Sequence, residues 1–319
     1  MVEKRKIAII GAGNVGISVA FALINQNNIG LKEIVLLDVA EEKAKGETLD
    51  LAQGVQFLKS SVKVYYGSYS DCYNADFGII TASVSSSNII KNRLELATEN
   101  TKLVSNITKE LLNFGFNGIF IIATNPVDLM TYVVKKVSDF PREKVIGTGT
   151  IIDTARLKYY LSKHYNVSTD NVEAYVLGEH GDSSFALWSH CKIGCENILD
   201  LLTKDKSSMT NLHEIFSKVQ KNGNEIANLK GNTCFTIAMS IVRIIKAIYL
   251  DENIILPVST YLQGEYQICD TCLGLPCILN QNGIDKVLNI KLNKSEQKKL
   301  EKSYNVLSKV KETDVIPYI

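Results

Sequence analysis

Lys6-Ile7-Ala8-Ile9-Ile10-Gly11-Ala12-Gly13-Asn14-Val15-Gly16 is the stretch that decides the fold. An apolar run rich in isoleucine leads directly into G-x-G-x-x-G spacing, and a helical pattern follows. In this setting Gly11 makes the tight turn, Gly13 lets a pyrophosphate approach the backbone, and Gly16 lets helix and strand pack closely. The first turn of the helix then offers N–H groups to the phosphates. The stretch predicts a dinucleotide-binding unit.

Asp38 stands at the end of the second expected strand. A carboxylate there can accept hydrogen bonds from both ribose hydroxyls and would repel a 2′-phosphate, so NAD is favoured over NADP. FAD uses the same fingerprint, and a glycine turn without a ligand is the plainer alternative.

The first 147 residues alternate short β-branched runs with helical patterns, which is typical of a parallel sheet with crossover helices. Strands are expected at 6–10, 33–37, 62–65, 77–81, 118–123 and 144–147, and helices at 15–26, 41–57, 94–113 and 127–138. The helix at 94–113 has the clearest period, on a stripe formed by Leu94, Ala97, Val104, Ile107 and Leu111. The pattern predicts an α/β fold with a Rossmann-type doubly wound parallel sheet.

After Gly147 longer helices mix with hairpin-like strands, which predicts a second, α+β substrate domain. Helices are expected at 152–164, 209–229, 233–250 and 295–311, the last with Asn293 and Glu296 as an N-cap pair. The expected domains are 1–147 for NAD and 148–319 for catalysis and substrate. Because no flexible linker separates them, we expect a tight boundary with a ligand cleft between the two.

Composition excludes several classes of protein. The 319 residues carry 35 Lys+Arg against 34 Asp+Glu, a net charge of +1, so a nucleic-acid partner is not expected. The basic tail at 291–311 has acids interspersed and indicates a solvated helix face. No apolar stretch reaches the roughly 18 residues of a membrane span, and no signal peptide is apparent, so we expect a soluble, cytoplasmic protein.

The number of cysteines also indicates a cytosolic protein. Seven cysteines cannot form a complete disulfide framework, and reduced thiols fit a cytosolic chain. Cys269 and Cys272 form a C-x-x-C without a second ligand pair nearby, so no metal site is expected.

His180 is the candidate acid–base residue. It lies in Gly178-Glu179-His180-Gly181-Asp182, where the glycines leave room for a substrate. Asp153 and Arg156 are three residues apart on one helical face, so that one can orient an imidazolium while the other holds a carboxylate. Removing or adding a hydroxyl proton during hydride transfer needs such a base, and an unperturbed imidazole titrates near pH 6.5.

These residues stand within a series of motifs that extends over nearly the whole chain: Gly11 to Gly16, Asp38, Thr124 to Asp128, Gly147 to Thr150, Asp153 to Arg156, Gly178 to Asp182 and Leu187 to His190. In order and spacing they resemble the L-lactate and malate dehydrogenase family. The resemblance implies NAD-dependent hydride transfer to and from a small 2-oxo or 2-hydroxy acid, as in glycolysis and fermentation. It also implies a homo-oligomer, with a tetramer favoured.

The resemblance also implies roles for individual residues. His180 would be the proton donor and acceptor, Asp153 its partner, Arg156 the anchor of the substrate carboxylate, and Arg93 an arginine that closes over the substrate. The implied substrate contacts are Arg93, Arg156, Asn125, Thr233 and Ser86. The implied cofactor contacts are Gly11, Gly13, Asn14, Val15, Gly16, Asp38, Lys43, Tyr69, Thr81, Ala82, Ser83, Asn125, Thr148 and Ile237.

The loop at 81–93 departs from the family pattern. Ser86 stands at the specificity position, where malate enzymes have an arginine and lactate enzymes usually a glutamine, and Lys91 is the nearest substitute cation. A second substrate carboxylate without a cation would be costly to bury, so malate is disfavoured. Lactate is the expected substrate. A bulkier acid such as 2-hydroxyisocaproate, with Ile89 and Ile90 nearby, and a non-catalytic NAD-binding paralogue are the alternatives.

Regulation by a sugar bisphosphate is not expected. Some bacterial members of the family are activated by fructose 1,6-bisphosphate through basic residues that match Lys158 and Glu173. A carboxylate at the second position would repel a phosphate.

Overall fold

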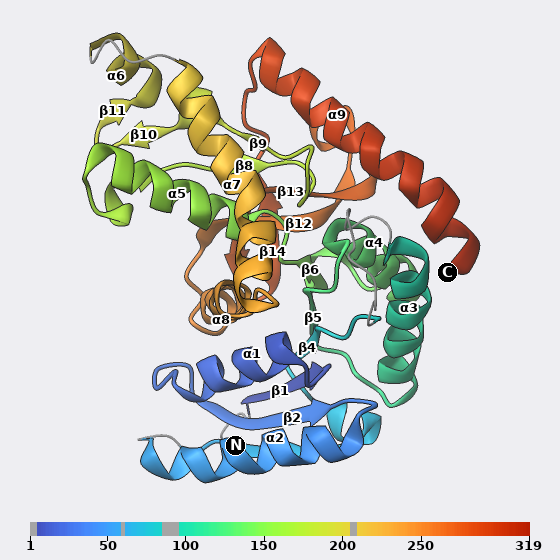
Figure 1. Cartoon of the computed structure of the whole chain (residues 1–319). Helices are drawn as coiled ribbons and strands as arrows, with labels where there is room; N and C mark the ends of the chain where they lie inside the picture. Colours follow the sequence, from blue (N-terminus) through green and yellow to red (C-terminus); the bar gives the residue numbers. More distant parts are fainter. Residues whose placement is uncertain (1–4, 59–60, 85–95, 205–208) are drawn as a thin grey trace.

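A nine-stranded sheet forms the centre of the molecule, in the order β14-β13-β12-β6-β5-β4-β1-β2-β3 (Figure 1). The computed structural model describes residues 5–58, 61–84, 96–204 and 209–319. No helix among these residues is long and apolar enough to cross a membrane.

The first half of the sheet is the expected doubly wound arrangement. Its strands are β1 (Arg5–Ile10), β2 (Leu31–Leu37), β3 (Lys63–Tyr66), β4 (Phe77–Ile80), β5 (Ile119–Ile122) and β6 (Val145–Gly147), all parallel. Strand order reverses between β1 and β4, and in open α/β sheets ligands bind in the crevice beyond the carboxyl ends of the strands at such a point.

Four helices connect these strands: α1 (Asn14–Ile24), α2 (Glu41–Gly54), α3 (Ala97–Asn113) and α4 (Val127–Ser138). The helix expected at 41–57 ends at Gly54 and continues as a 3-10 turn. The stripe predicted for α3 is buried from Ala97 onward, while Leu94 lies outside the described residues. α3 and α4 pack together on one side of the sheet, and α1 packs against α8 on the other (Figure 1).

The second half adds five helices and eight strands in the described part of the chain. The helices are α5 (Ile151–Tyr165), α6 (Ile198–Lys204), α7 (Met209–Lys230), α8 (Phe235–Tyr249) and α9 (Lys294–Val310). The strands are β7 (Val172–Glu173), β8 (Val176–Leu177), β9 (Phe185–Ala186), β10 (Lys192–Ile193), β11 (Glu196–Asn197), β12 (Ile254–Gln263), β13 (Cys269–Asn280) and β14 (Gly283–Val287). Short helical turns include η2 (Tyr69–Cys72), η7 (Glu265–Gln267) and η8 (Lys311–Val315).

The sheet continues from one half into the other through a narrow seam. β12 runs antiparallel to β6, and Ser259 opposite Gly147 is their register pair. A Cβ on Gly147 would lie 2.8 Å from the Cβ of Ser259, and one on Gly149 would lie 2.3 Å from its backbone nitrogen. The seam therefore has no room for side chains at either glycine.

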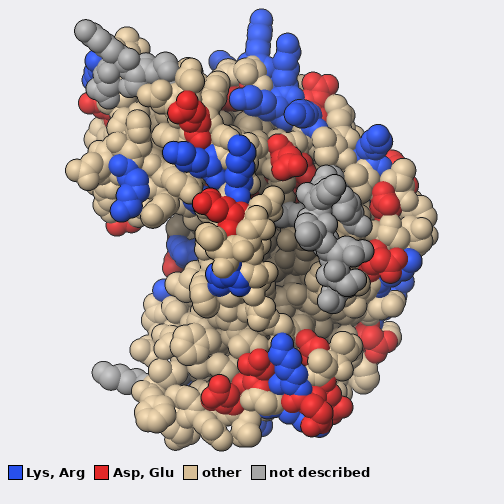
Figure 2. Space-filling model, viewed as in Figure 1, with Lys and Arg blue, Asp and Glu red and all other residues tan. Residues whose placement is uncertain are grey.

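The C-terminal helix α9 begins with the expected cap. The Asn293 side chain accepts the N–H groups of Ser295 and Glu296, and the Glu296 carboxylate accepts the N–H of Asn293. Figure 2 shows Lys and Arg side chains along the upper face of the molecule in this view. The prediction of a solvated face for the whole 291–311 tail is wrong at two positions: Glu296 caps the helix from a buried site, and Lys311 is buried against Asp270 because their charges pair.

Candidate active site

The glycine turn between β1 and α1 has the geometry that the motif requires. Gly11 has a φ of +110°, and a Cβ on it would lie 2.5 Å from the backbone nitrogen of Ala82. A Cβ on Gly16 would lie 1.9 Å from the carbonyl oxygen of Gly11, whereas one on Gly13 would have nothing within 4 Å. Strand and helix are thus in close contact, and open space remains at Gly13 where a phosphate could approach.

The N-terminus of α1 suits an anion. It has no side-chain cap, and its first turn, which includes Asn14 and Val15, carries no acidic residue. The partial positive charge of the helix end is therefore not neutralised by a carboxylate of that turn.

Asp38 lies just beyond β2 and faces the same turn. Its Oδ2 accepts the N–H of Ala12 at 2.7 Å, and its Oδ1 accepts the N–H of Ala40 at 2.8 Å. Each oxygen keeps a second lone pair, so the carboxylate is held in place and can still accept from two hydroxyls.

The segment after β4 forms the opposite wall of the turn. The Thr81 hydroxyl donates to the carbonyl of Gly11 at 2.8 Å, and the N–H of Ala82 donates to that of Ile10 at 2.9 Å. The Thr124 hydroxyl, after β5, donates to the carbonyl of Ala82 at 2.7 Å. Three parallel strands thus end in one connected group.

Asn125 contributes a polar atom to this edge of the sheet. Its Oδ1 is buried and has no hydrogen-bond partner among the described residues. Its backbone carbonyl accepts from the side chain of Asn100 at 2.7 Å, and Asn100 Oδ1 accepts the N–H of Val84 at 2.9 Å. A buried polar atom without a partner is costly, so a ligand contact at Asn125 is favoured.

His180, Asp153 and Arg156 lie together in the structure. Nδ1 of His180 lies 2.5 Å from Oδ2 of Asp153, and Nη1 of Arg156 lies 3.4 Å from the other carboxylate oxygen. All three side chains are at most about a tenth exposed. A carboxylate in this position fixes the orientation and the tautomer of the imidazole.

Two threonines connect the helix that carries Asp153 and Arg156 to the strand before His180. On α5, the Thr154 hydroxyl accepts the N–H of Val176 at 2.9 Å, and the Thr150 hydroxyl donates to the carbonyl of the same residue at 2.6 Å. They fasten the start of α5 to β8, the strand that leads to His180.

The loop after β8 is fastened from several sides. The Glu179 carboxylate is buried and accepts a hydrogen bond from the Ser183 hydroxyl. Ser303 of α9 donates to the carbonyl of Ser183 at 2.7 Å, and Gln220 of α7 donates to that of Asp182 at 3.1 Å. The loop that carries His180 is therefore held by both helices.

Thr233, Ile237 and Thr148 are three further residues that were predicted for the site. Thr233 precedes α8 and Ile237 is buried in its first turn, and α8 contacts both α1 and α5. Thr148 is buried, and its N–H donates to the carbonyl of Ile122 at 2.9 Å.

For the remaining predicted cofactor contacts, the structure gives the exposure and the surroundings of each side chain. Ser83 and Lys43 are exposed. Tyr69 packs against the core, and burial, with Cys72 and Glu110 nearby, raises the pKa of its phenol. Three predicted positions, Ser86, Lys91 and Arg93, lie outside the described residues.

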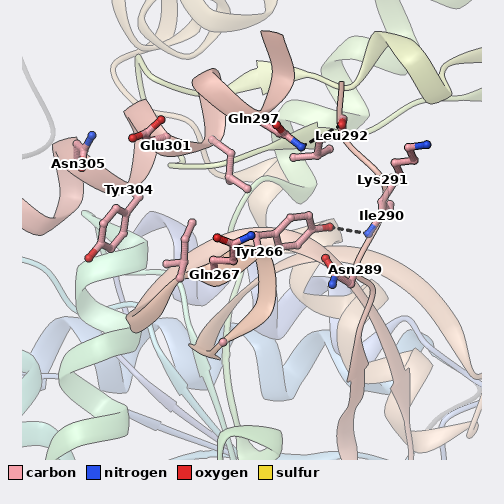
Figure 3. Close-up of a pocket in the computed structure, with 13 residues that line it drawn as sticks. Tyr266, Gln267, Asn289, Ile290, Lys291, Leu292, Gln297, Glu301, Tyr304 and Asn305 are labelled. Atoms are coloured by element: carbon pink, nitrogen blue, oxygen red, sulfur yellow. Dashed lines mark hydrogen bonds between the residues drawn. The ribbon is translucent and has the colours of Figure 1, made fainter. Parts of the chain in front are cut away.

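A cavity of about 780 Å³ lies away from this group, between η7, the segment at 289–292 and α9 (Figure 3). Tyr266, Gln267 and Tyr304 line it, whereas His180, Asp153 and Arg156 do not. Within the described residues no group of three or more His, Cys, Asp or Glu is placed to hold a metal, and all seven cysteines are free.

Sequence reasoning missed two polar residues at the site. Asn100 lies in the gap of the α3 stripe between Ala97 and Val104 and is fully buried, so a polar residue on an apolar stripe was its signal. Asp128 is buried in the first turn of α4, at the end of the 124–128 motif. Its signal was weaker, because an acid at a helix start is usually explained as a favourable charge–dipole contact.

Comparisons with known proteins cover almost the whole chain. Residues 5–147 match the family model for the NAD-binding domain of lactate/malate dehydrogenases, and residues 150–315 match that for the alpha/beta C-terminal domain of the same family. L-lactate dehydrogenase of Borrelia hermsii is 42% identical over 309 residues, which are 96% of this chain and 97% of that protein. L-lactate dehydrogenase 1 of Peribacillus psychrosaccharolyticus is 42% identical over 306 residues, 96% and 95% of the two chains. The crystal structure of minor L-lactate dehydrogenase from Enterococcus mundtii in its ligand-bound form superposes with a TM-score of 0.92 at 39% identity, covering 98% of each chain.

Proposed function

The chain belongs to the lactate/malate dehydrogenase family, and we propose that it is an NAD-dependent L-lactate dehydrogenase that interconverts pyruvate and L-lactate. The observation that carries this proposal is that His180 and Arg156 both contact Asp153, in the second half of the chain. A non-catalytic NAD-binding protein would need only the turn and Asp38.

The residues around the glycine turn fit the cofactor. The space at Gly13 and the uncapped start of α1 suit the pyrophosphate, and the fixed Asp38 carboxylate suits the ribose hydroxyls. The unpartnered Oδ1 of Asn125 suits a contact at the reacting end. NADH supplies the hydride when it is bound.

The reaction assigns one role to each side chain of the catalytic group. Arg156 binds the substrate carboxylate through its guanidinium, which presents two donors in the geometry of a carboxylate. Protonated His180 donates its proton to the carbonyl oxygen as pyruvate is reduced, and the neutral imidazole takes that proton back from lactate in the reverse direction. Asp153 keeps the ring oriented and stabilises its charged form. Arg93 is proposed, from the resemblance, to close over the substrate and polarise the carbonyl.

Lactate is preferred to the other candidate substrates. The relatives named above are L-lactate dehydrogenases, so a bulkier 2-hydroxy acid is not favoured. Malate stays disfavoured by the absence of an arginine from the 81–92 sequence, with Ser86 at the specificity position. We also propose that residues 1–147 form the NAD-binding domain and that residues 148–319 form the catalytic domain.

We further propose that the enzyme is cytoplasmic and forms a homo-oligomer, with a tetramer favoured. A groove of about 560 Å³ lies between α1, α2 and α8, and Phe21, Phe235 and Met239 line it with 60%, 68% and 58% of their surfaces exposed. Large exposed apolar groups that cluster in this way typically mark a protein–protein interface. Light scattering at micromolar concentration tests this, and a monomer would contradict it.

Substrate-dependent oxidation of NADH tests the proposed activity. We expect the highest kcat/KM with pyruvate among pyruvate, 2-oxoisocaproate, phenylpyruvate and oxaloacetate, and lower activity with NADPH. Best activity with oxaloacetate would overturn the argument from the 81–92 loop, and no activity with any 2-oxo acid would overturn the proposal itself.

A further inference from the structure

The carboxylate of Asp128 connects the backbone of His180 to the seam of the sheet. Oδ2 accepts the N–H of His180 at 2.8 Å, and Oδ1 accepts the hydroxyl of Ser259 at 2.6 Å. Asp128 is 2% exposed. It belongs to α4, which follows β5 and Asn125, so a residue from the cofactor half touches the catalytic histidine.

The backbone at His180 needs such an anchor because glycines stand near it on both sides. Gly178 has a φ of +94°, and its N–H and carbonyl pair with Gly274 of β13, both at 2.9 Å. Gly181 follows His180 directly. Glycine backbones have more conformational freedom than others, so the histidine would be poorly fixed by its neighbours alone. Asp153 holds the ring, and Asp128 holds the amide.

We propose that Asp128 is a positioning residue for the reaction, whose buried carboxylate fixes the backbone of His180 relative to the carboxyl end of β5 and its Asn125. This inference rests on the proposed function, because that function gives His180 its role. A displacement of the imidazole by a fraction of an ångström from the reacting oxygen lowers the rate without weakening cofactor binding.

The charge of Asp128 also acts on the site. The pKa of its carboxyl is raised to about 7, chiefly by burial and also by the nearby carboxylates of Glu179 and Asp153, while the hydrogen bonds from Ser259 and His180 act in the opposite direction. In its ionised form the carboxylate places a negative charge next to the backbone of His180, and a negative charge stabilises a nearby cation. Titratable groups near it come from the loop after β8, from α5 and from β13: Glu179, His180, Asp153 and Cys272.

Two substitutions separate geometry from charge. Asp128→Ala removes both hydrogen bonds. Asp128→Asn keeps the shape: its amide oxygen can accept from His180 and its amide nitrogen can donate to Ser259, but the charge is lost. Asp139→Asn is the matched control, since Asp139 is an exposed carboxylate at the other end of α4.

We expect kcat for pyruvate reduction to fall about 100-fold in Asp128→Ala, with the Kd for NADH close to that of the wild type. Asp128→Asn should recover most of kcat, and its pH profile of kcat/KM should move to lower pH because the charge that favours imidazolium is gone. If Asp128→Ala does not fold, Ser259→Ala, which removes one of the two hydrogen bonds that hold the carboxylate, is measured in its place and should also lower kcat. Wild-type kcat and an unshifted pH profile in Asp128→Asn, together with wild-type kcat in Asp128→Ala or in the Ser259→Ala variant that replaces it, would overturn the proposal.

A second measurement does not depend on turnover. The chain has four histidines, so the imidazole resonances can be assigned by NMR with His180→Asn as reference. We expect the His180 resonance to shift or split in Asp128→Ala, or in Ser259→Ala if the former is unfolded, and to stay in place in Asp139→Asn. An unmoved resonance would overturn the positioning role. A wild type that reduces no 2-oxo acid would instead contradict the proposed function, while the NMR result would still test the anchor.

Discussion

Asp153 and His180 face each other across 2.5 Å, from the first turn of α5 and from the loop after β8. The contact joins Oδ2 to Nδ1, and we propose that the other ring nitrogen, Nε2, exchanges the proton with the substrate oxygen. The backbone N–H of His180 also donates to Asp128, so both the ring and the main chain of this residue have a carboxylate partner.

Removing the imidazole should abolish turnover and spare the cofactor. For His180→Asn we expect kcat to fall about 1000-fold, within the range of general acid–base catalysis, and NADH to bind as in the wild type by fluorescence titration. His190→Asn is the control, because His190 is exposed on a short turn ten residues further on. Unchanged turnover in His180→Asn would remove this residue from its role.

The glycines of the turn should respond differently to alanine. Gly13→Ala meets open space at an ordinary φ of −79°, so the free energy of unfolding should stay close to that of the wild type while NADH affinity falls at least about tenfold, or 1.4 kcal/mol. Gly16→Ala would overlap the Gly11 carbonyl and should lower the free energy of unfolding by about 3 kcal/mol. Denaturant titrations and NADH titrations measure both effects. Tight NADH binding by Gly13→Ala would contradict the assigned pyrophosphate position.

Asp270 should stabilise the fold in a pH-dependent way. Burial alone would raise the pKa of its carboxyl, but hydrogen bonds from Lys136, Lys311 and Tyr261 outweigh this and lower it to about 2. The folded pKa lies below the unfolded value of about 3.9, so the stabilisation is present above about pH 4 and is lost as the pH falls toward 2. Since the side chain is about half exposed, solvent screening leaves about 1 kcal/mol.

The variant that tests this is Asp270→Asn, whose amide tolerates the φ of +55° found there. Its free energy of unfolding should be lower than that of the wild type at pH 7, and the difference should shrink between pH 4 and pH 2. Asp285→Asn, at an exposed position on β14, is the control. A difference that does not change with pH would refute the ion-pair account.

Fructose 1,6-bisphosphate should leave the pyruvate saturation curve unchanged. Glu173 is exposed, and its carboxylate lies 3.6 Å from Nζ of Lys192, so a phosphate approaching this lysine would meet a negative charge. Initial rates at low pyruvate, with and without the bisphosphate, measure this. A clear activation curve would show the prediction to be wrong.

Much of the cofactor half was predictable because local signals agree there. The apolar run before Gly11 and the glycine spacing locate β1 and α1 within one or two residues, and α4 matches its prediction at both ends. It begins directly after Pro126 and ends before Asp139, whose φ of +53° stops a helix.

What escaped prediction depends on contacts between distant segments. The pairing of Ser259 with Gly147 has no local pattern, and the burial of Lys311 depends on Asp270, forty-one residues away. Likewise the role of Asp128 becomes visible only when α4 and the loop after β8 are seen together. Polar residues of this kind carry no hydrophobic period, so a sequence alone gives them little weight.

The glycine seam between β6 and β12 limits how this protein can be recombined. A chimera that takes its first half from one relative and its second half from another separates Gly147 from Ser259. In such a chimera, any side chain larger than hydrogen at position 147 would collide with Thr131 and Ser259. Halves from two relatives therefore fit together only where position 147 stays glycine opposite Ser259. Their joint must be transplanted whole, with β6, the start of α5 and the middle of β12 taken from the same parent.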